Sequence, residues 1–338
     1  MYEDGQVTRA KPGLVVDENM SYSGPMNTQA RPRAILIAGP TASGKSAFAM
    51  AVARARGGVV INADSMQVYS ELRVLTARPS ADDEASVPHR LFGHVSVSEP
   101  YSVARWLDEV SAEIAAAEAE GLLPVITGGT GLYFKALLEG LSPIPPIPED
   151  IRSHWRAAGE TWCAQDLHAE LVRRDARAAA KIPPSDRQRM VRALEVIAAT
   201  GRSLAEWQAV GGRPVLDAAS AAKVVVARPR EELYERAERR FRQMIGEGAL
   251  DEVRLVCDLQ LDPALPAARA LGLAPLLAHV AGEMTLEEAV ATSVRDTRHY
   301  IKRQATWLRR YMISWISFSA QEMETQSATD FPILHFIR

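Results

Sequence analysis

Cysteines, aromatic residues and net charge are all scarce in this 338-residue chain. Its two cysteines, Cys163 and Cys257, are far apart and lack metal-ligand spacing. This excludes a disulfide scaffold and favours reduced, buried thiols in a cytoplasmic protein. No apolar run reaches the roughly 18–20 residues that a membrane helix needs. A net charge of −3 argues against a protein that coats nucleic acid through bulk positive potential.

What the chain does contain is enough apolar material for a large core, because 47% of its residues are hydrophobic. A chain of this length is expected to form two structural units. Residues 1–31 lack both the apolar stretch of a secretion signal and any helical periodicity, so we predict a disordered N-terminal tail there. We predict a second tail at residues 321–338.

A glycine-rich segment at residues 39–46 carries the clearest chemical signal. Its members are Gly39, Pro40, Thr41, Ala42, Ser43, Gly44, Lys45 and Ser46. An apolar, strand-like run precedes it and a helix-like run follows, which is the setting of a phosphate-binding loop. Backbone N–H groups and the positive end of the new helix would hold a diphosphate. Lys45 would add an ammonium group, and Ser46 would offer a hydroxyl to Mg²⁺.

Further apolar runs alternate with helix-like segments along the chain. Strand-like runs occur at 59–61, 122–127 and 224–227, and a helix-like pattern covers 103–120. This alternation predicts an α/β fold with a parallel sheet and helices on both faces. Asp64 and Thr130 follow two of the runs. We therefore expect both side chains at the carboxyl edge of the sheet, beside the loop.

The chain between the third and fourth strand-like runs differs from the rest. Residues 141–148 are a proline-rich linker, and helical patterns then continue from 149 to 208. We predict a first core segment at 32–142, a helical insertion at 143–213 and a second core segment at 214–320. That last segment is helical except for a possible short strand at 313–318.

Two segments carry local positive charge in spite of the negative total. The segment from Arg152 to Arg192 contains nine Lys or Arg residues and five Asp or Glu residues. The segment from Arg295 to Arg310 contains six Lys or Arg residues and one acidic residue. Such faces imply a polyanionic partner, which a kinase of a small metabolite would not need.

The polar and aromatic cluster at 64–69 also suits an organic acceptor better than a purely metal-binding role for Asp64. The loop alone leaves open whose diphosphate it holds.

Six motifs in order resemble those of the bacterial tRNA dimethylallyltransferases. They lie at 39–46, 64–69 (Asp-Ser-Met-Gln-Val-Tyr), 88–91 (Pro-His-Arg-Leu), 128–133 (Gly-Gly-Thr-Gly-Leu-Tyr), 186–192 (Asp-Arg-Gln-Arg-Met-Val-Arg) and 302–309 (Lys-Arg-Gln-Ala-Thr-Trp-Leu-Arg). The resemblance extends from about residue 33 to residue 310. It implies a P-loop NTPase-like core with an inserted helical domain that grips the anticodon stem.

The resemblance also implies a reaction. Dimethylallyl diphosphate, aided by Mg²⁺, would give its dimethylallyl group to N6 of adenine 37, and diphosphate would leave. Asp64 would take the N6 proton, Thr130 would donate near the reacting centre, and Arg240 would be a second clamp on the diphosphate. The adenine must leave its stack to react. The implied tRNA contacts are Asp64, Ser65, Met66, Gln67, Arg152, Gln188, Arg189, Arg192, Lys302, Arg303, Gln304 and Arg309. We assign Trp307 to the core and expect a monomer.

The chain departs from the family pattern at three places. Leu75 stands at a position that is glycine in many members, Gly93 stands in place of an aspartate, and Leu273 replaces a tyrosine. Two other functions remain as alternatives. One is an isopentenyltransferase that acts on free AMP or ADP, and the other is a P-loop kinase of a small metabolite.

Overall fold

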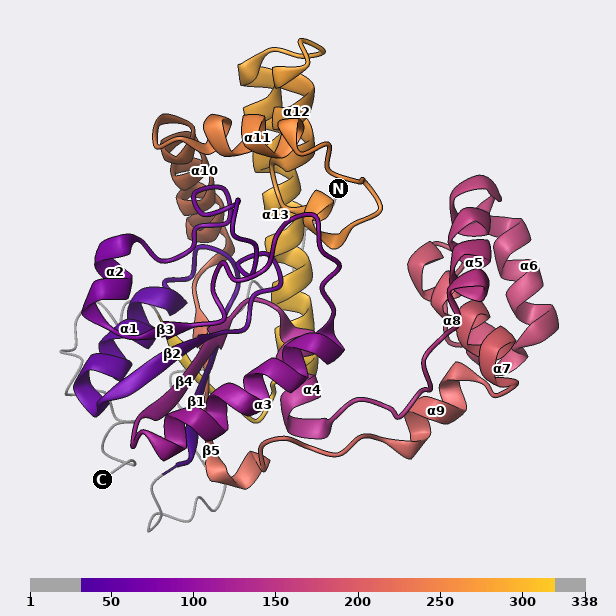
Figure 1. The fold of residues 1–338 in the computed structure, drawn as a ribbon, viewed down its shortest axis with the longest axis horizontal. Coiled ribbons are helices and arrows are strands. Elements are labelled where there is room, and N and C mark those ends of the chain that lie inside the picture. Colours follow the sequence, from indigo (N-terminus) through magenta and orange to yellow (C-terminus); the bar gives the residue numbers. More distant parts are fainter. Residues whose placement is uncertain (1–31, 320–338) are drawn as a thin grey trace, which may run out of the picture.

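The structure, a computed structural model, describes residues 32–319. Both predicted tails, at 1–31 and 321–338, lie outside the described residues. A sheet of six parallel strands forms the centre, in the order β3-β2-β4-β1-β5-β6 (Figure 1). The strands are β1 (Ala34–Ala38), β2 (Gly58–Asn62), β3 (His89–Arg90), β4 (Leu123–Gly128), β5 (Ala221–Ala227) and β6 (Ile316–Ser319). The predicted α/β class is confirmed.

Helices cover both faces of the sheet, which explains why β1 and β2 are buried along their whole length. On one face, α1 (Lys45–Arg56) packs Phe48 and Val52 against the sheet residues Ile35, Val60 and Val125. On the other, α3 (Val103–Ala119) and α4 (Gly131–Glu139) pack against the remaining side chains of the same strands. Burial on both faces therefore fixes the position of the strand ends.

The register of the sheet brings three strand ends to one edge. Ala38, the last residue of β1, pairs with Gly128 of β4, and Asn62, the last residue of β2, pairs with Thr127. The loops that follow these strands must therefore start side by side. Ligands of parallel sheets bind at this carboxyl edge.

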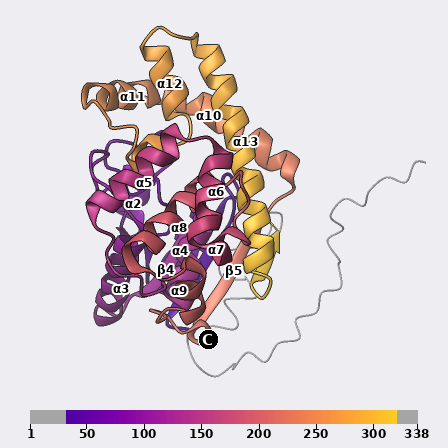
Figure 2. The same ribbon diagram turned by 90° about the vertical axis from the view of Figure 1, so that its right-hand side faces the viewer.

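The helices between Glu149 and Val210 form a bundle with a core of its own. They are α5 (Glu149–Thr161), α6 (Ala164–Arg174), α7 (Ala176–Ala179), α8 (Arg187–Thr200) and α9 (Leu204–Val210). Trp155, Leu167, Leu171 and Met190 belong to that core. The bundle stands to the side of the sheet, and two chain segments without helix or strand connect it (Figures 1 and 2).

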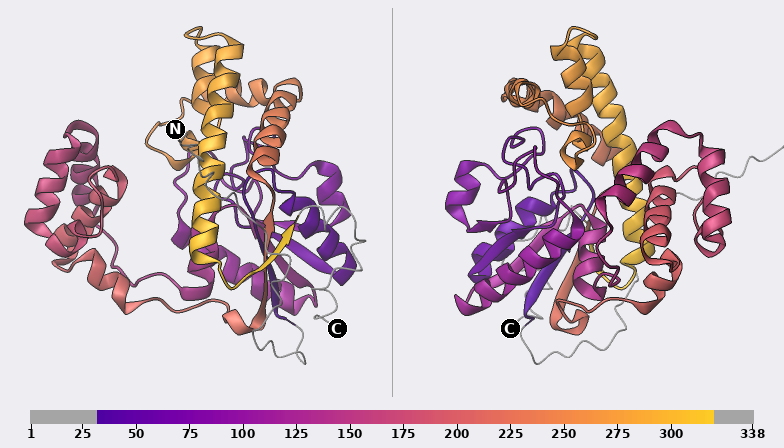
Figure 3. Two further views of the ribbon diagram at one scale, coloured as in Figure 1. Left: turned by 180° about the vertical axis from the view of Figure 1, so that it is seen from behind. Right: turned by 45° about the vertical axis from the view of Figure 1, so that its right-hand side comes forward.

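The chain after β5 is almost entirely helical. It contains α10 (Arg230–Gly246), α11 (Ala249–Asp258), η2 (Pro266–Arg269), α12 (Leu273–Val280) and α13 (Leu286–Tyr311), and a short helix η1 (Ala218–Ser220) precedes β5. A capping box of Thr285 and Glu288 starts α13. This long helix runs from the tip of the helical group down beside the sheet (Figure 3). It therefore reaches the carboxyl edge of the sheet.

Some local expectations were wrong or incomplete. The two-residue strand β3 and the helix α2 (Ala81–Ser86) were not predicted, and the late strand β6 begins at Ile316 instead of residue 313. Both cysteines are free, as expected, but Cys163 and Cys257 are exposed, whereas we had predicted buried thiols. Cys163 starts α6, where its sulfur accepts a hydrogen bond from the Asp166 N–H. Between residues 32 and 319, no helix combines the length and apolarity of a membrane span.

Candidate active site

The segment at residues 39–46 links β1 to α1 and curls as a phosphate-binding loop does. Ala42 (φ 67°) and Gly44 (φ 96°) both have left-handed backbone conformations. This alternation turns successive N–H groups toward one concave side, where an anion can bind. A side chain at Gly39 would force its neighbours to move, because a Cβ there would lie 2.7 Å from Ser43 Oγ and 3.0 Å from the Val226 carbonyl oxygen. The Ser43 hydroxyl is buried without a hydrogen-bond partner among the described residues.

Two arginines from the second core segment donate hydrogen bonds to backbone carbonyl groups of this loop. Arg236 Nε donates to the Ala42 carbonyl (3.0 Å), and Arg228 Nε donates to the Ser43 carbonyl (3.2 Å). A pocket of about 290 Å³ opens between the loop and α10. Its lining consists of Ala42, Gly44, Lys45, Ser46, Ala47, Arg236, Arg239, Arg240 and Gln243. Four cationic side chains and no acid line this pocket, so it is suited to a compact anion.

The charges in the pocket already affect one another. Burial lowers the pKa of Lys45 to about 8, with Arg240 acting in the same direction and Asp64 opposing both. Burial also lowers the pKa of Arg240, again against the effect of Asp64. The carboxylate of Asp64 therefore stabilises the positive charge of both Lys45 and Arg240, which burial disfavours. A bound diphosphate would supply the negative charge that the pocket itself lacks.

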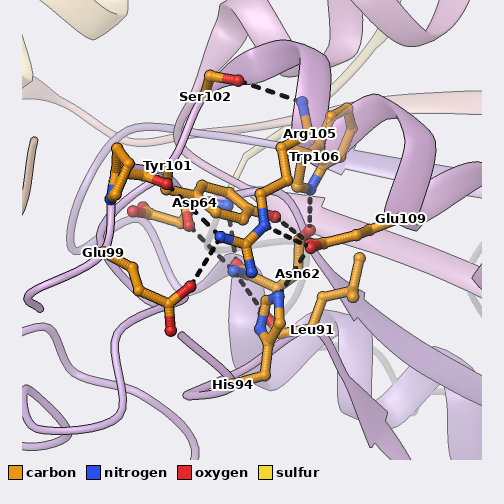
Figure 4. Close-up of polar contacts among 11 residues, drawn as sticks. Asn62, Asp64, Leu91, His94, Glu99, Tyr101, Ser102, Arg105, Trp106 and Glu109 are labelled. Carbon is orange, nitrogen blue, oxygen red and sulfur yellow. Dashed lines mark hydrogen bonds and ion pairs between the residues drawn. The ribbon is translucent and has the colours of Figure 1, made fainter. Parts of the chain in front are cut away.

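Asp64 lies at the end of β2, where a network of neutral side chains fixes its backbone. Asn62 Oδ1 accepts from the Asp64 N–H (2.8 Å), and Asn62 Nδ2 donates to the carbonyl oxygens of Asp64 and Leu91 (both 3.0 Å). Trp106 Nε1 donates to the Asn62 carbonyl (2.8 Å) (Figure 4). Asn62 and Trp106 are both buried. The carboxylate is thus presented by a rigid support.

A second network lies beside this support. The Glu109 carboxylate accepts from the Tyr101 hydroxyl (2.5 Å) and Arg105 Nε (2.9 Å), and His94 Nε2 lies 2.9 Å from it (Figure 4). Although burial opposes the effect, these contacts lower the pKa of Glu109. The network joins α3 to the loop that carries His94, and so it braces the chain around Asp64.

Asp64 itself has one carboxylate oxygen engaged and one turned toward β4. Oδ1 accepts from the Met66 N–H (3.0 Å), as in an Asx turn. Oδ2 lies 3.3 Å from the point that a Cβ on Gly129 would occupy. Thr130, the N-cap residue of α4, accepts from the Ser65 N–H at its hydroxyl (3.0 Å). The structure therefore brings Asp64 and Thr130 together, as their positions after two parallel strands predicted.

Gln304 of α13 makes contacts within the protein that the sequence did not predict. We had placed it among the tRNA contacts, which stays a prediction; here its side chain is buried. Its amide oxygen accepts from the Thr41 N–H (2.9 Å), and its amide nitrogen donates to the Gly129 carbonyl (3.0 Å). Gln304 thus ties the phosphate-binding loop to the end of β4. The missing side chains of Gly129 and Gly131 let α13 approach this closely, because Cβ atoms there would collide with Gln304 and Trp307.

The other predicted tRNA contacts fall into three groups. Ser65, Met66 and Gln67 are partly buried after Asp64, and the Gln67 amide nitrogen donates to the carbonyls of Thr76 and Ala77 (2.9 Å each). In the insertion, Gln188 and Arg189 are exposed on α8, while Arg192 and Arg152 are partly buried. Lys302, Arg303 and Arg309 are exposed on α13. Trp307 is partly buried and packs against the main core cluster, in agreement with its assignment.

Sequence reasoning missed two arginines and a tyrosine at this site. Arg228 and Arg236 support the loop from α10 and the turn before it. Arg236 lies one helical turn before Arg240, so the spacing of the two along one helix face was an available signal. Tyr300 lies one turn before Gln304 on α13, and burial, together with the negative charge of Asp64, raises its pKa. No motif pointed to it.

A parallel sheet whose first strand leads into a phosphate-binding loop defines the P-loop class of α/β proteins. Family models then give the particular family: the model for IPP transferase matches residues 67–311, and the model for isopentenyl transferase matches residues 32–94. The first match alone covers most of the chain. The chain belongs to the IPP transferase family.

Individual relatives agree with this assignment. The chain is 51% identical over 306 residues to the tRNA dimethylallyltransferase of Parvibaculum lavamentivorans, which covers 90% of this chain and 96% of the relative. It is 49% identical to the enzyme of that name from Rhodopseudomonas palustris, over 88% of this chain and 94% of the relative. The resemblance seen in the motifs is thereby confirmed.

Solved structures give the same result. The tRNA isopentenylpyrophosphate transferase of Bacillus halodurans superposes with a TM-score of 0.60 at 33% identity, covering 85% of this chain and 89% of that one. A eukaryotic dimethylallyltransferase that acts on tRNA superposes with a TM-score of 0.73 at 25% identity, covering 86% of this chain and 75% of that one. The fold and the family assignment therefore rest on independent comparisons.

Proposed function

We propose that this protein transfers a dimethylallyl group from dimethylallyl diphosphate to N6 of adenine 37 in tRNA and releases diphosphate. One observation carries the proposal: the rigidly held carboxylate of Asp64 lies at the same sheet edge as a cation-lined phosphate pocket. A kinase needs a carboxylate for its metal, but a transfer to an amine needs one that accepts a proton. The family membership of the chain supports the second role.

The proposed reaction assigns a task to each side of the site. N6 of adenine forms a bond to the allylic carbon, and the bond from that carbon to the diphosphate oxygen breaks with its electrons going to oxygen. Asp64 takes the proton that N6 loses. Lys45, Arg240 and the N–H groups of the loop stabilise the charge that grows on the leaving diphosphate. Because these groups are already in place, little reorganisation is needed.

Mg²⁺ fits the site only together with the donor. Ser46 is exposed at the pocket, and its hydroxyl is one suitable ligand. Residues 32–319 hold no group of three or more His, Cys, Asp or Glu side chains that could bind a metal without help. Mg²⁺ often keeps several waters and binds through phosphate oxygens, so one protein hydroxyl suffices. When bound, the ion would neutralise part of the diphosphate charge.

The acceptor is proposed to be tRNA, because exposed cations lie on two separate elements. Arg189 extends from α8 with 72% of its side chain exposed, and its only carboxylate neighbour among the described residues is Asp186, at 3.3 Å. Lys302, Arg303 and Arg309 are exposed on α13. A free nucleotide would need neither surface.

Transfer of label tests the proposal directly. Labelled dimethylallyl diphosphate and Mg²⁺ are incubated with the protein and either bulk tRNA, AMP or ADP, without ATP. We expect label in tRNA alone. Label in AMP or ADP would identify an adenylate isopentenyltransferase. An absolute requirement for ATP, with phosphoryl transfer to a small metabolite, would identify a kinase.

We expect the rate constant kcat/KM for the donor to fall as the pH rises above about 8. Lys45 has a lowered pKa of about 8, so the free enzyme holds the charged ammonium below that pH and the neutral amine above it. Because kcat/KM reports ionisation of the free enzyme, the loss should appear there, at up to tenfold per pH unit. Lys45→Arg keeps its charge across this range. If its profile retained the same alkaline limb, Lys45 would not be the titrating group.

Binding of tRNA should weaken steeply with salt, because each neutralised phosphate releases counterions. Replacing Arg189 and Arg192 by Ala is expected to flatten the slope of log K against log salt by roughly one unit per lost contact. Filter binding at several salt concentrations gives the slope. The control is Arg173→Ala, an exposed arginine that pairs with Glu170 on α6 of the same insertion. An unchanged slope in the double variant would remove α8 from the RNA surface.

A further inference from the structure

A buried amide supports the backbone of the proposed proton acceptor. Asn62 Oδ1 accepts from the Asp64 N–H (2.8 Å), and Asn62 Nδ2 donates to the carbonyl oxygens of Asp64 and Leu91 (both 3.0 Å). A side-chain amide has two N–H donors and one acceptor oxygen, so backbone groups already occupy both donors and the oxygen. The side chain is also completely buried. Asn62 is therefore not placed to bind substrate, and its effect on the reaction must pass through its neighbours.

Leu91, the second carbonyl partner of this amide, has an unusual backbone conformation. Its φ of 62° lies in the left-handed region, which is uncommon for residues other than glycine. Such strain persists only where the surrounding structure fixes it, and it is found preferentially at functional sites. Leu91 is the last residue of the motif at 88–91, to which the proposed reaction assigns no task. Its carbonyl, held by Asn62, connects this motif to Asp64.

The chain beyond this carbonyl continues the support. The N–H groups of Gly93 and Val95 donate to the carbonyl oxygens of Gln67 and Val68 (3.0 Å each). The turn that follows the carboxylate is therefore held by the same short segment as the amide that precedes it. With its backbone fixed on both sides, the carboxylate has a defined position at the sheet edge.

We propose that Asn62 is a positioning residue that holds the carboxylate of Asp64 where it can take the N6 proton. The inference rests on the proposed function. Asp64 receives this proton as N6 bonds to the allylic carbon and diphosphate leaves with the electrons of the broken bond. Proton transfer requires the acceptor oxygen within hydrogen-bond distance, and a displacement of about 1 Å can lower a rate about 10²-fold. Asn62 itself neither touches substrate nor exchanges a proton.

Asn62→Asp tests this role because it keeps the size of the side chain and removes both N–H donors. Asn62→Ala removes the same contacts without adding a charge. For both variants we expect the single-turnover rate constant, expressed per site that binds inorganic pyrophosphate with Mg²⁺, to fall about 10²-fold. The affinities for pyrophosphate and tRNA, measured by calorimetry and filter binding, should stay near those of the unmodified protein. The control is Gln260→Glu, the same chemical change at an exposed position after α11.

Double variants separate positioning from a general structural role. In Asp64→Asn no carboxylate remains to be held, so a further change at Asn62 should lower the remaining rate less than about twofold. An equal fall in both backgrounds, or loss of pyrophosphate binding in both single variants, would overturn the assignment, as would an unchanged rate in the single variants. Absence of transfer to tRNA by the unmodified protein would instead overturn the proposed function, and the positioning role with it.

Discussion

Asp64→Asn is expected to lower the single-turnover rate constant for prenyl transfer by about 10²–10⁴, the usual contribution of a general base. The affinity for tRNA should stay near that of the unmodified protein. Asparagine keeps the size of the side chain and can still accept from the Met66 N–H through its amide oxygen, as Asp64 Oδ1 does at 3.0 Å. The loop should therefore keep its shape, and only proton acceptance is lost.

Rapid-quench measurement with enzyme in excess over tRNA separates this effect from product release. Filter binding of the same variant gives the tRNA affinity. Asp251→Asn, at a largely exposed position on α11, is the control for a change of net charge. A near-normal rate in Asp64→Asn would exclude the general-base role and would leave Asp64 as a turn residue only.

The position of Asp64 was predictable because it follows from the sheet alone. Apolar runs gave the strands, and parallel pairing places their carboxyl ends at one edge. The loop at 39–46, Asp64 and Thr130 each come directly after such a strand. The local sequence pattern therefore located both the phosphate-binding loop and the carboxylate that we propose as the proton acceptor.

The contribution of α13 was not predictable in this way. Gln304 lies 263 residues from Thr41 and 175 residues from Gly129, and it contacts both. Nothing in the local sequence says that α13 passes over these loops, so the contacts of Gln304 within the protein were not predicted. The glycines at 129 and 131 were visible in the sequence. Their physical reason, a helix packed against their backbone, appears only in three dimensions.

The departures from the family pattern also have structural counterparts. Leu75 is buried, and its Cδ1 would lie 3.3 Å from a Cβ on Gly272, so the larger side chain fills space beside a glycine. Its N–H donates to Glu252 (2.9 Å). Gly93 has φ 56°, and the Arg78 guanidinium occupies the place where its Cβ would be. An aspartate at position 93 would require that arginine to move.

The second large effect is expected for Arg240→Ala, at about 10²–10³ in the single-turnover rate constant, which is typical for the loss of one preorganised group that stabilises developing charge. Arg240 lines the phosphate pocket, and its charge interacts with Asp64 and Arg236. It is therefore close enough to the carboxylate for the two charges to interact, and it shares a pocket with the loop. Its guanidinium remains charged despite burial, because arginine is not deprotonated in proteins.

Arg239→Ala is the matched control, since this neighbouring arginine lines the same pocket but is exposed. An exposed charge in water is screened and should contribute much less to the rate. Arg240→Lys should recover part of the loss, because it restores the charge without the forked donor geometry. If Arg240→Ala kept its rate and instead bound tRNA weakly, Arg240 would face the RNA. The leaving diphosphate would then be stabilised by Lys45 and the loop alone.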